Sequence, residues 1–66
     1  MRILLIEDDA EIRTMVQDYL SGDFTICSFS DGGSAVRQIQ NYDAYSLALI
    51  DLMLPDMSGM EIIKTI

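Results

Sequence analysis

Two short apolar runs that each end in carboxylates constrain the fold of this chain more than any other feature. Residues 3–6 read Ile-Leu-Leu-Ile and lead into the acids of residues 7–9, and residues 47–50 read Leu-Ala-Leu-Ile and lead into Asp51. A continuous apolar run of this length is typical of a strand that is buried on both faces, as in a parallel sheet. We therefore expect residues 3–6 to form a strand that is buried on both faces, and residues 47–50 to form a further apolar strand, each with acids at its carboxyl end.

A helical pattern follows the first of these runs. The apolar residues 12, 15, 16, 19 and 20 recur at the spacing of one face of an amphipathic helix. Asp8 or Asp9 can cap the start of this helix. Gly22 stands where a terminating residue in the left-handed conformation is expected.

The remaining segments continue an alternation of strands and helices. Residues 24–29 are rich in β-branched and aromatic side chains and predict a strand. An Asp-Gly-Gly turn then leads to a weaker helical stripe at residues 35, 36 and 39, which ends near Asn41. Ser58 and Glu61 form a capping box for a last helix. This order predicts a single α/β unit, a parallel sheet with helices on both faces.

Composition narrows the function classes. The net charge of −7 argues against nucleic-acid binding by this segment, because nucleic-acid phosphates would repel it. Cys27 is the only cysteine, so an internal disulfide is excluded, and it is more typical of a small core residue than of a nucleophile. No apolar run reaches the length of a membrane span or a secretory signal. We expect a cytoplasmic location without membrane contact.

The acids at the strand ends predict a cation site. If the first and third strands are neighbours, Glu7, Asp8 and Asp51 converge at one edge of the sheet. Clustered carboxylates repel one another, and a hard divalent ion such as Mg²⁺ relieves that repulsion. A carboxylate can also act as a nucleophile. The alternative is that each acid merely caps a helix or ends a strand.

Two segments resemble the hallmark motifs of response-regulator receiver domains. They are residues 3–9, Ile-Leu-Leu-Ile-Glu-Asp-Asp, and residues 49–59, Leu-Ile-Asp-Leu-Met-Leu-Pro-Asp-Met-Ser-Gly. The second is closest to regulators with a carboxy-terminal winged-helix DNA-binding domain. The resemblance implies a flavodoxin-like fold with five strands in the order 2-1-3-4-5.

The resemblance also implies roles for individual residues. Asp51 is expected to be the phosphoacceptor, Asp8 a direct ligand of Mg²⁺ (or Mn²⁺), and Glu7 a ligand through water. Met53 would offer its backbone carbonyl to the metal, and Pro55 and Gly59 would shape the loop. A sensor histidine kinase would donate the phosphoryl group, so the chain is expected to be a phosphoacceptor and not an enzyme. DNA would be bound only through a separate carboxy-terminal domain.

On this resemblance, residues 1–66 form a partial receiver domain, truncated after the third strand with strand order 2-1-3. The hydroxyl residue and the lysine that contact the phosphoryl group in the family have no counterpart, so switching by this segment alone is not expected. The exposed third strand predicts a homo-oligomer or a swapped pairing. The alternative function is a non-catalytic interaction or dimerisation fragment. A haloacid-dehalogenase-type phosphatase is disfavoured, because Met53 stands where its acid/base aspartate is needed.

Overall fold

A computed structural model describes residues 1–38 and 44–65 of the chain. Its elements are β1 (Arg2–Ile6), α1 (Ala10–Leu20), β2 (Thr25–Phe29), α2 (Gly32–Gln38), β3 (Leu47–Ile50) and α3 (Gly59–Thr65). The alternation of strands and helices expected from the sequence is confirmed. Ile39 and Asn41, on which the predicted end of the second helix depended, lie outside the described residues.

The strands form one parallel sheet in the order β2-β1-β3. This is the order 2-1-3 that the receiver resemblance implied. Ile6, the last residue of β1, lies opposite Ile50, the last residue of β3. The Asp51 N–H extends this pairing and donates to the Ile6 carbonyl at 2.9 Å. The register therefore brings the residues that follow β1 and β3 to the same edge of the sheet.

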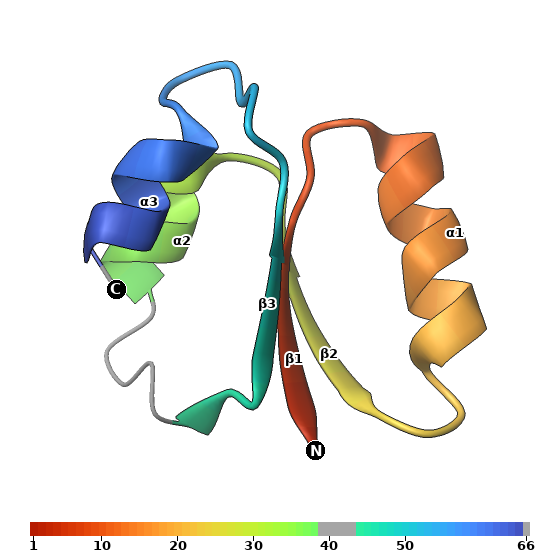
Figure 1. The fold of residues 1–66 in the computed structure, drawn as a ribbon. Coiled ribbons are helices and arrows are strands. Elements are labelled where there is room, and N and C mark those ends of the chain that lie inside the picture. The colour runs from red at the N-terminus through yellow and green to blue at the C-terminus, as the bar shows by residue number, and fades with distance from the viewer. Residues whose placement is uncertain (39–43, 66) are drawn as a thin grey trace.

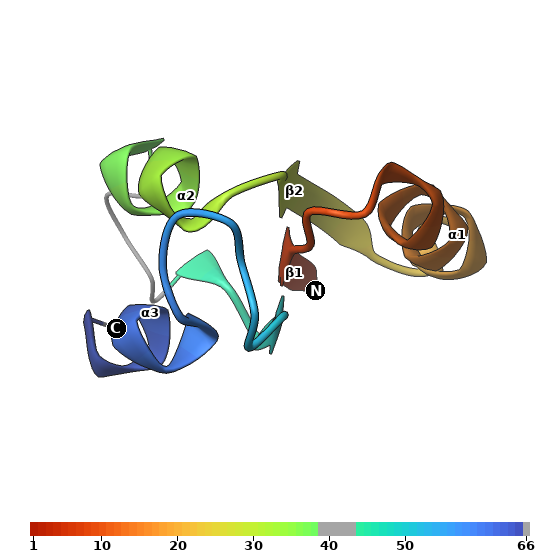
Figure 2. The same cartoon turned by 90° about the horizontal axis from the view of Figure 1, so that it is seen from above.

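Helices cover both faces of the sheet, with α1 on one face and α2 and α3 on the other (Figures 1 and 2). The buried cluster lies on the side of α2 and α3 and comprises Leu4, Ile6, Ala35, Leu54 and Ile62. Residues 3–6 of the central strand β1 are all buried, as predicted. They are buried because β1 has a strand on each side and helices over both faces.

The second apolar run is exposed, as expected for a third strand at the edge of the sheet. Leu47 and Leu49 of β3 are 49% and 36% exposed. In the described residues β3 is an edge strand, since its only pairing is with β1. Its apolar side chains therefore have fewer neighbours than those of β1.

The apolar stripe of α1 is also more exposed than its spacing suggests. No residue of α1 is buried, and Met15 and Tyr19 are 62% and 86% exposed. A polar contact joins the helix to the β2 side of the sheet, where Gln17 Nε2 donates to Ser28 Oγ at 2.7 Å. The apolar stripe of α1 therefore lies on an open surface of the molecule.

Glycines act here through their small size. The prediction of a left-handed conformation at Gly22 is wrong, because no described glycine has a positive φ. The C-cap of α1 is Ser21, which lies in the right-handed region. Gly32 and Gly33 begin α2. A Cβ on Gly33 would lie 2.8 Å from Asp56 Oδ2, and one on Gly32 would overlap the Met57 side chain. Because these two glycines have no side chains, the loop that follows β3 has room to pack against the start of α2.

Candidate metal centre

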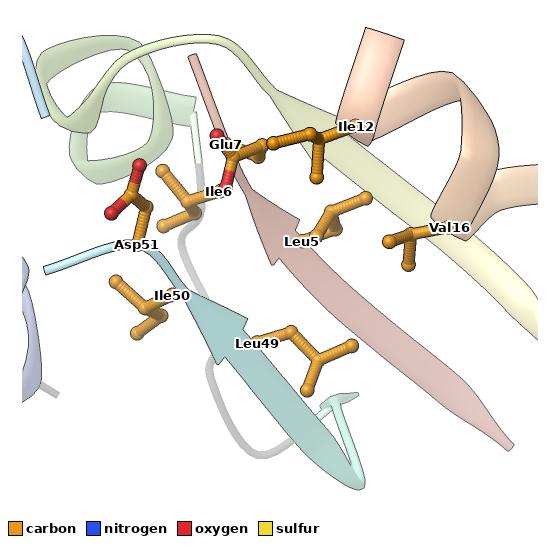
Figure 3. A pocket seen from close by; sticks show the side chains of 8 residues that line it. All are labelled: Leu5, Ile6, Glu7, Ile12, Val16, Leu49, Ile50 and Asp51. Atoms are coloured by element: carbon orange, nitrogen blue, oxygen red, sulfur yellow. The ribbon is translucent and has the colours of Figure 1, made fainter. Parts of the chain in front are cut away.

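The three acids singled out in the sequence come together at the carboxyl ends of β1 and β3. Glu7, Asp8 and Asp51 each offer a carboxylate oxygen within 4.8 Å of the other two. Figure 3 shows the side chains of Glu7 and Asp51 above the ends of the two strands. Ligands on opposite sides of an octahedral Mg²⁺ are about 4 Å apart, since each bond is ~2.1 Å. The donor set and its spacing therefore fit one hard divalent cation after small side-chain movements.

The acids of the loop between β1 and α1 have two different roles. Asp9 caps α1, and its Oδ1 accepts hydrogen bonds from the N–H groups of Glu11 at 2.9 Å and Ile12 at 3.3 Å. Asp9 rather than Asp8 is therefore the cap. Glu7 Oε1 accepts the Asp9 N–H at 3.2 Å. Asp8 leaves its exposed carboxylate directed to the acid cluster.

The acid cluster changes the proton affinity of Glu7. Burial is the largest cause that raises its pKa, and the negative charges of Asp51 and Asp8 raise it further. The hydrogen bond from the Asp9 N–H acts in the opposite direction. Burial and the neighbouring carboxylates thus raise the proton affinity of Glu7, and a bound divalent ion would lower it.

The loop after β3 holds Asp51 through its backbone. Asp51 Oδ1 accepts the Met53 N–H at 3.0 Å, and Met53 pairs with Ser58 in an antiparallel bridge. The Met53 side chain is 84% exposed. Its backbone rather than its side chain is therefore the part that contacts the candidate site.

Gly59 lies where the loop after Asp51 turns back into α3. Its N–H donates to the Leu52 carbonyl at 3.1 Å. A Cβ at this position would overlap the Asp51 carbonyl oxygen and lie 2.8 Å from Leu52 Cα. Ser58 caps α3 by accepting the Met60 N–H at 3.1 Å on its Oγ. Pro55 is exposed on the same loop.

Asp56 is a structural residue of this loop that the sequence interpretation missed. Its carboxylate accepts the Gly32 N–H at 3.0 Å and the Gly33 N–H at 2.7 Å. These bonds, the one from Gly33 foremost, hold the pKa of Asp56 below its ordinary value. They tie the loop that carries Asp51 to the start of α2. Asp56 is far from Gly32 and Gly33 in the sequence, and no sequence pattern indicates that these residues are in contact.

Glu7 and Asp51 lie at one end of an open groove between α1 and β3 (Figure 3). The groove has a volume of about 330 Å³. Apart from Glu7 and Asp51, the side chains that line it are apolar: Leu5, Ile6, Ile12, Val16, Leu49 and Ile50. Glu7 and Asp51 are therefore accessible from the α1 side of the sheet.

This structure defines an α/β protein whose carboxylates gather at the ends of two neighbouring parallel strands. Residues 3–66 match the family described as the response regulator receiver domain. The chain therefore belongs to the receiver-domain family of two-component response regulators.

Known proteins of this family support the same assignment. The chain is 35% identical over 66 residues to the regulatory protein VanRc of Enterococcus gallinarum, covering 98% of this chain. It is 41% identical over 64 residues to the uncharacterized transcriptional regulatory protein YcbL of Bacillus subtilis, covering 96% of this chain. In both cases it spans 28% of the relative's length.

Two solved receiver structures show the same arrangement. The non-phosphorylated HemR receiver domain of Leptospira biflexa superimposes with a TM-score of 0.89 at 28% identity, covering 97% of this chain and 52% of that one. The response regulator TrrA of Thermotoga maritima, in complex with Mg²⁺ and a beryllium fluoride, superimposes with a TM-score of 0.80 at 25% identity, covering 97% and 56%. The chain thus spans about half of these receiver structures.

Proposed function

We propose that Asp51 is the phosphoacceptor of a receiver domain to which residues 1–66 contribute the first three strands. The observation that carries this proposal is the convergence of Glu7, Asp8 and Asp51 within 4.8 Å at the end of two adjacent strands. An isolated strand-end aspartate would need no such neighbours, since acids close together raise the energy of the site.

The proposed reaction transfers one phosphoryl group to Asp51. A carboxylate oxygen of Asp51 attacks the phosphorus of a phosphohistidine on a sensor kinase. A P–O bond forms while the P–N bond breaks, and the histidine leaves with the electron pair of that bond. The product is an acyl phosphate on Asp51. One chain accepts one group, so this is signalling chemistry rather than turnover by an enzyme.

The acid cluster suits Mg²⁺, or Mn²⁺ in its place, because both prefer oxygen ligands. Asp8 and Asp51 would bind the ion directly, Glu7 through water, and Met53 through its backbone carbonyl. When bound, the ion would neutralise charge on the phosphoryl oxygens. The loop residues Pro55 and Gly59 would hold Asp51 and the Met53 carbonyl in position relative to each other. The TrrA structure with Mg²⁺ and a beryllium fluoride supports this choice of ion.

The partners follow from the same proposal. TrrA has also been solved in complex with the histidine kinase ThkA, which supports a sensor histidine kinase as the phosphoryl donor. The relative named as a transcriptional regulatory protein supports a role in transcription, with DNA bound by a further winged-helix domain of the whole protein. Among the described helices, none has the length and apolarity needed to cross a bilayer.

A titration with beryllofluoride, an analogue of the phosphoryl group, tests the proposal without the kinase. Fluorine NMR of the chain with Mg²⁺ should show a bound signal that requires both the metal and Asp51. Asp51→Asn should lose it, and Asp8→Asn should weaken it strongly. Asp23→Asn, an exposed control far from the cluster, should retain it. A signal that survives in Asp51→Asn, or no signal at any Mg²⁺ concentration, would contradict the proposal.

The exposed edge of β3 favours a second candidate function. Leu47 and Leu49 lie on a strand whose outer edge pairs with no other strand in the described part of the chain, and such an edge is a template for association with another chain. The chain would then act as an interaction or dimerisation segment without phosphoryl chemistry. Absence of any beryllofluoride signal together with stable self-association would support this candidate.

A further inference from the structure

Arg13 of α1 reaches back to the loop that carries the metal-binding candidates. Its Nη1 donates to the Glu7 carbonyl at 2.8 Å and to the Asp8 carbonyl at 3.4 Å. Long helical side chains point toward the helix N-terminus, so a residue one turn inside α1 is well placed for this contact. The backbone N–H of Arg13 is bonded separately, to the Asp9 carbonyl at 2.9 Å.

The two carbonyls that Arg13 contacts belong to the residues whose carboxylates form the cluster. On its other side Glu7 is held by the sheet, because its N–H donates to the Phe29 carbonyl at 3.1 Å. Arg13 thus fixes the peptide units from which the side chains of Glu7 and Asp8 leave the backbone. Within the described residues, the other hydrogen bonds of this loop involve the Glu7 N–H, the Glu7 carboxylate with the Asp9 N–H, and the Asp9 cap and carbonyl, so none of them binds the Glu7 or Asp8 carbonyl.

We propose that Arg13 is a positioning residue of the metal centre, holding the β1–α1 loop so that Asp8 and Glu7 converge on Asp51. The inference rests on the proposed function, since it concerns the same cation site. Arg13 does not touch the metal or the phosphoryl group. It acts through the two carbonyls.

The charge of Arg13 and its proposed positioning role predict opposite effects on the metal affinity when the side chain is removed. A guanidinium close to a divalent cation repels it, so on charge alone Arg13→Ala would tighten metal binding. Residues that orient metal ligands from outside the coordination shell are typically worth ~10–100-fold in affinity. If positioning dominates, Arg13→Ala weakens metal binding by about this factor.

The test is a Mn²⁺ titration of the 66-residue chain in which the electron paramagnetic resonance signal measures the free ion. Arg13→Ala should bind Mn²⁺ at least about ten-fold more weakly than the wild type. Arg37→Ala removes the same charge from α2, where Arg37 contacts Ser34 Oγ at 3.5 Å, and should leave the affinity unchanged. Arg13→Lys, which keeps the charge and one donor group, should restore part of the loss.

A second variant covers the case in which Arg13→Ala does not fold, as judged by far-ultraviolet circular dichroism. Arg13→Gln is neutral but keeps a donor amide, so positioning predicts an affinity below that of the wild type. An affinity of either folded variant equal to or above that of the wild type would overturn the inference. A wild-type chain that binds no Mn²⁺ would instead count against the proposed metal centre itself.

Discussion

At the scale of the residue, Glu7 is held where its charged form is less stable than in the unfolded chain. Burial and the charges of Asp51 and Asp8 raise its pKa in the folded chain. The folded state therefore binds a proton on Glu7 more tightly than the unfolded state does. The stability linked to this proton is fully present below the unfolded pKa and is lost as the pH rises through the higher folded value.

Glu7→Gln should therefore stabilise the metal-free chain at neutral pH. Thermal unfolding followed by circular dichroism should show a higher midpoint for the variant than for the wild type at pH 7, and the gap should close in acid. The same variant should bind Mn²⁺ about ten-fold more weakly, because a proposed ligand of the metal would be lost. Glu11→Gln, on the exposed first turn of α1, is the matched control. A lower midpoint for Glu7→Gln at pH 7 would contradict the charge crowding inferred for the cluster.

The sequence allowed the acids of the cluster to be predicted, but not the residues that hold them. Asp51, Glu7 and Asp8 follow apolar runs, and parallel strands bring such positions together. Arg13 and Asp56 instead bind backbone groups. Every residue except proline carries a backbone N–H and every residue a carbonyl, so no side-chain pattern reveals which of them will be contacted.

At the scale of the element, the loop between β3 and α3 depends on the absence of a side chain at Gly59. Gly59→Ala should destabilise the chain by about 1–3 kcal/mol, the usual cost of inserting a methyl group where none fits. The reason is the overlap of the new Cβ with the Asp51 carbonyl oxygen. Urea unfolding of the wild type and the variant measures this difference.

Gly22→Ala is the matched control for that substitution. Nothing lies within 4 Å of a Cβ at Gly22, and no described glycine has a positive φ. Alanine should therefore be tolerated there and stabilise the chain by about 0.4–1 kcal/mol, since it restricts the unfolded chain. Equal losses of stability from the two substitutions would show that the close approach of Gly59 to the Asp51 carbonyl does not determine the stability of the loop.

Element positions could be predicted from the sequence more reliably than element burial. The apolar runs located β1 and β3, and the spacing of residues 12 to 20 located α1. Periodicity shows which side chains share a face, but it does not show what covers that face. The stripe of α1 is therefore correctly placed along the chain, but its exposure was not foreseen, whereas the exposed edge at β3 was expected from the truncated receiver resemblance.

At the scale of the whole molecule, the sheet has one well-packed face and one open face. The buried cluster lies under α2 and α3, whereas the groove between α1 and β3 is open and largely apolar. The strand order could be predicted only through the receiver resemblance, because periodicity alone does not say which strand is central. The open face and the edge of β3 together predict self-association.

Leu49→Lys should reduce that self-association. Sedimentation velocity should show larger species for the wild type as its concentration rises, and a shift toward monomer for the variant, because a charged edge strand resists pairing. Met60→Lys, which places the same charge at a half-exposed position on α3, should behave like the wild type. A wild type that remains monomeric across the concentration range would rule out pairing through β3.

The central claim is that Asp51 accepts a phosphoryl group beside a cation held by Glu7 and Asp8. Its most direct test is to incubate the chain with acetyl phosphate and Mg²⁺ and to measure the intact mass and the masses of its peptides. The account predicts the addition of one phosphoryl group to the peptide that contains Asp51, dependent on Mg²⁺, absent in Asp51→Asn and retained in Asp23→Asn. A chain that stays unmodified at every Mg²⁺ concentration, or a modification that persists in Asp51→Asn, would contradict it.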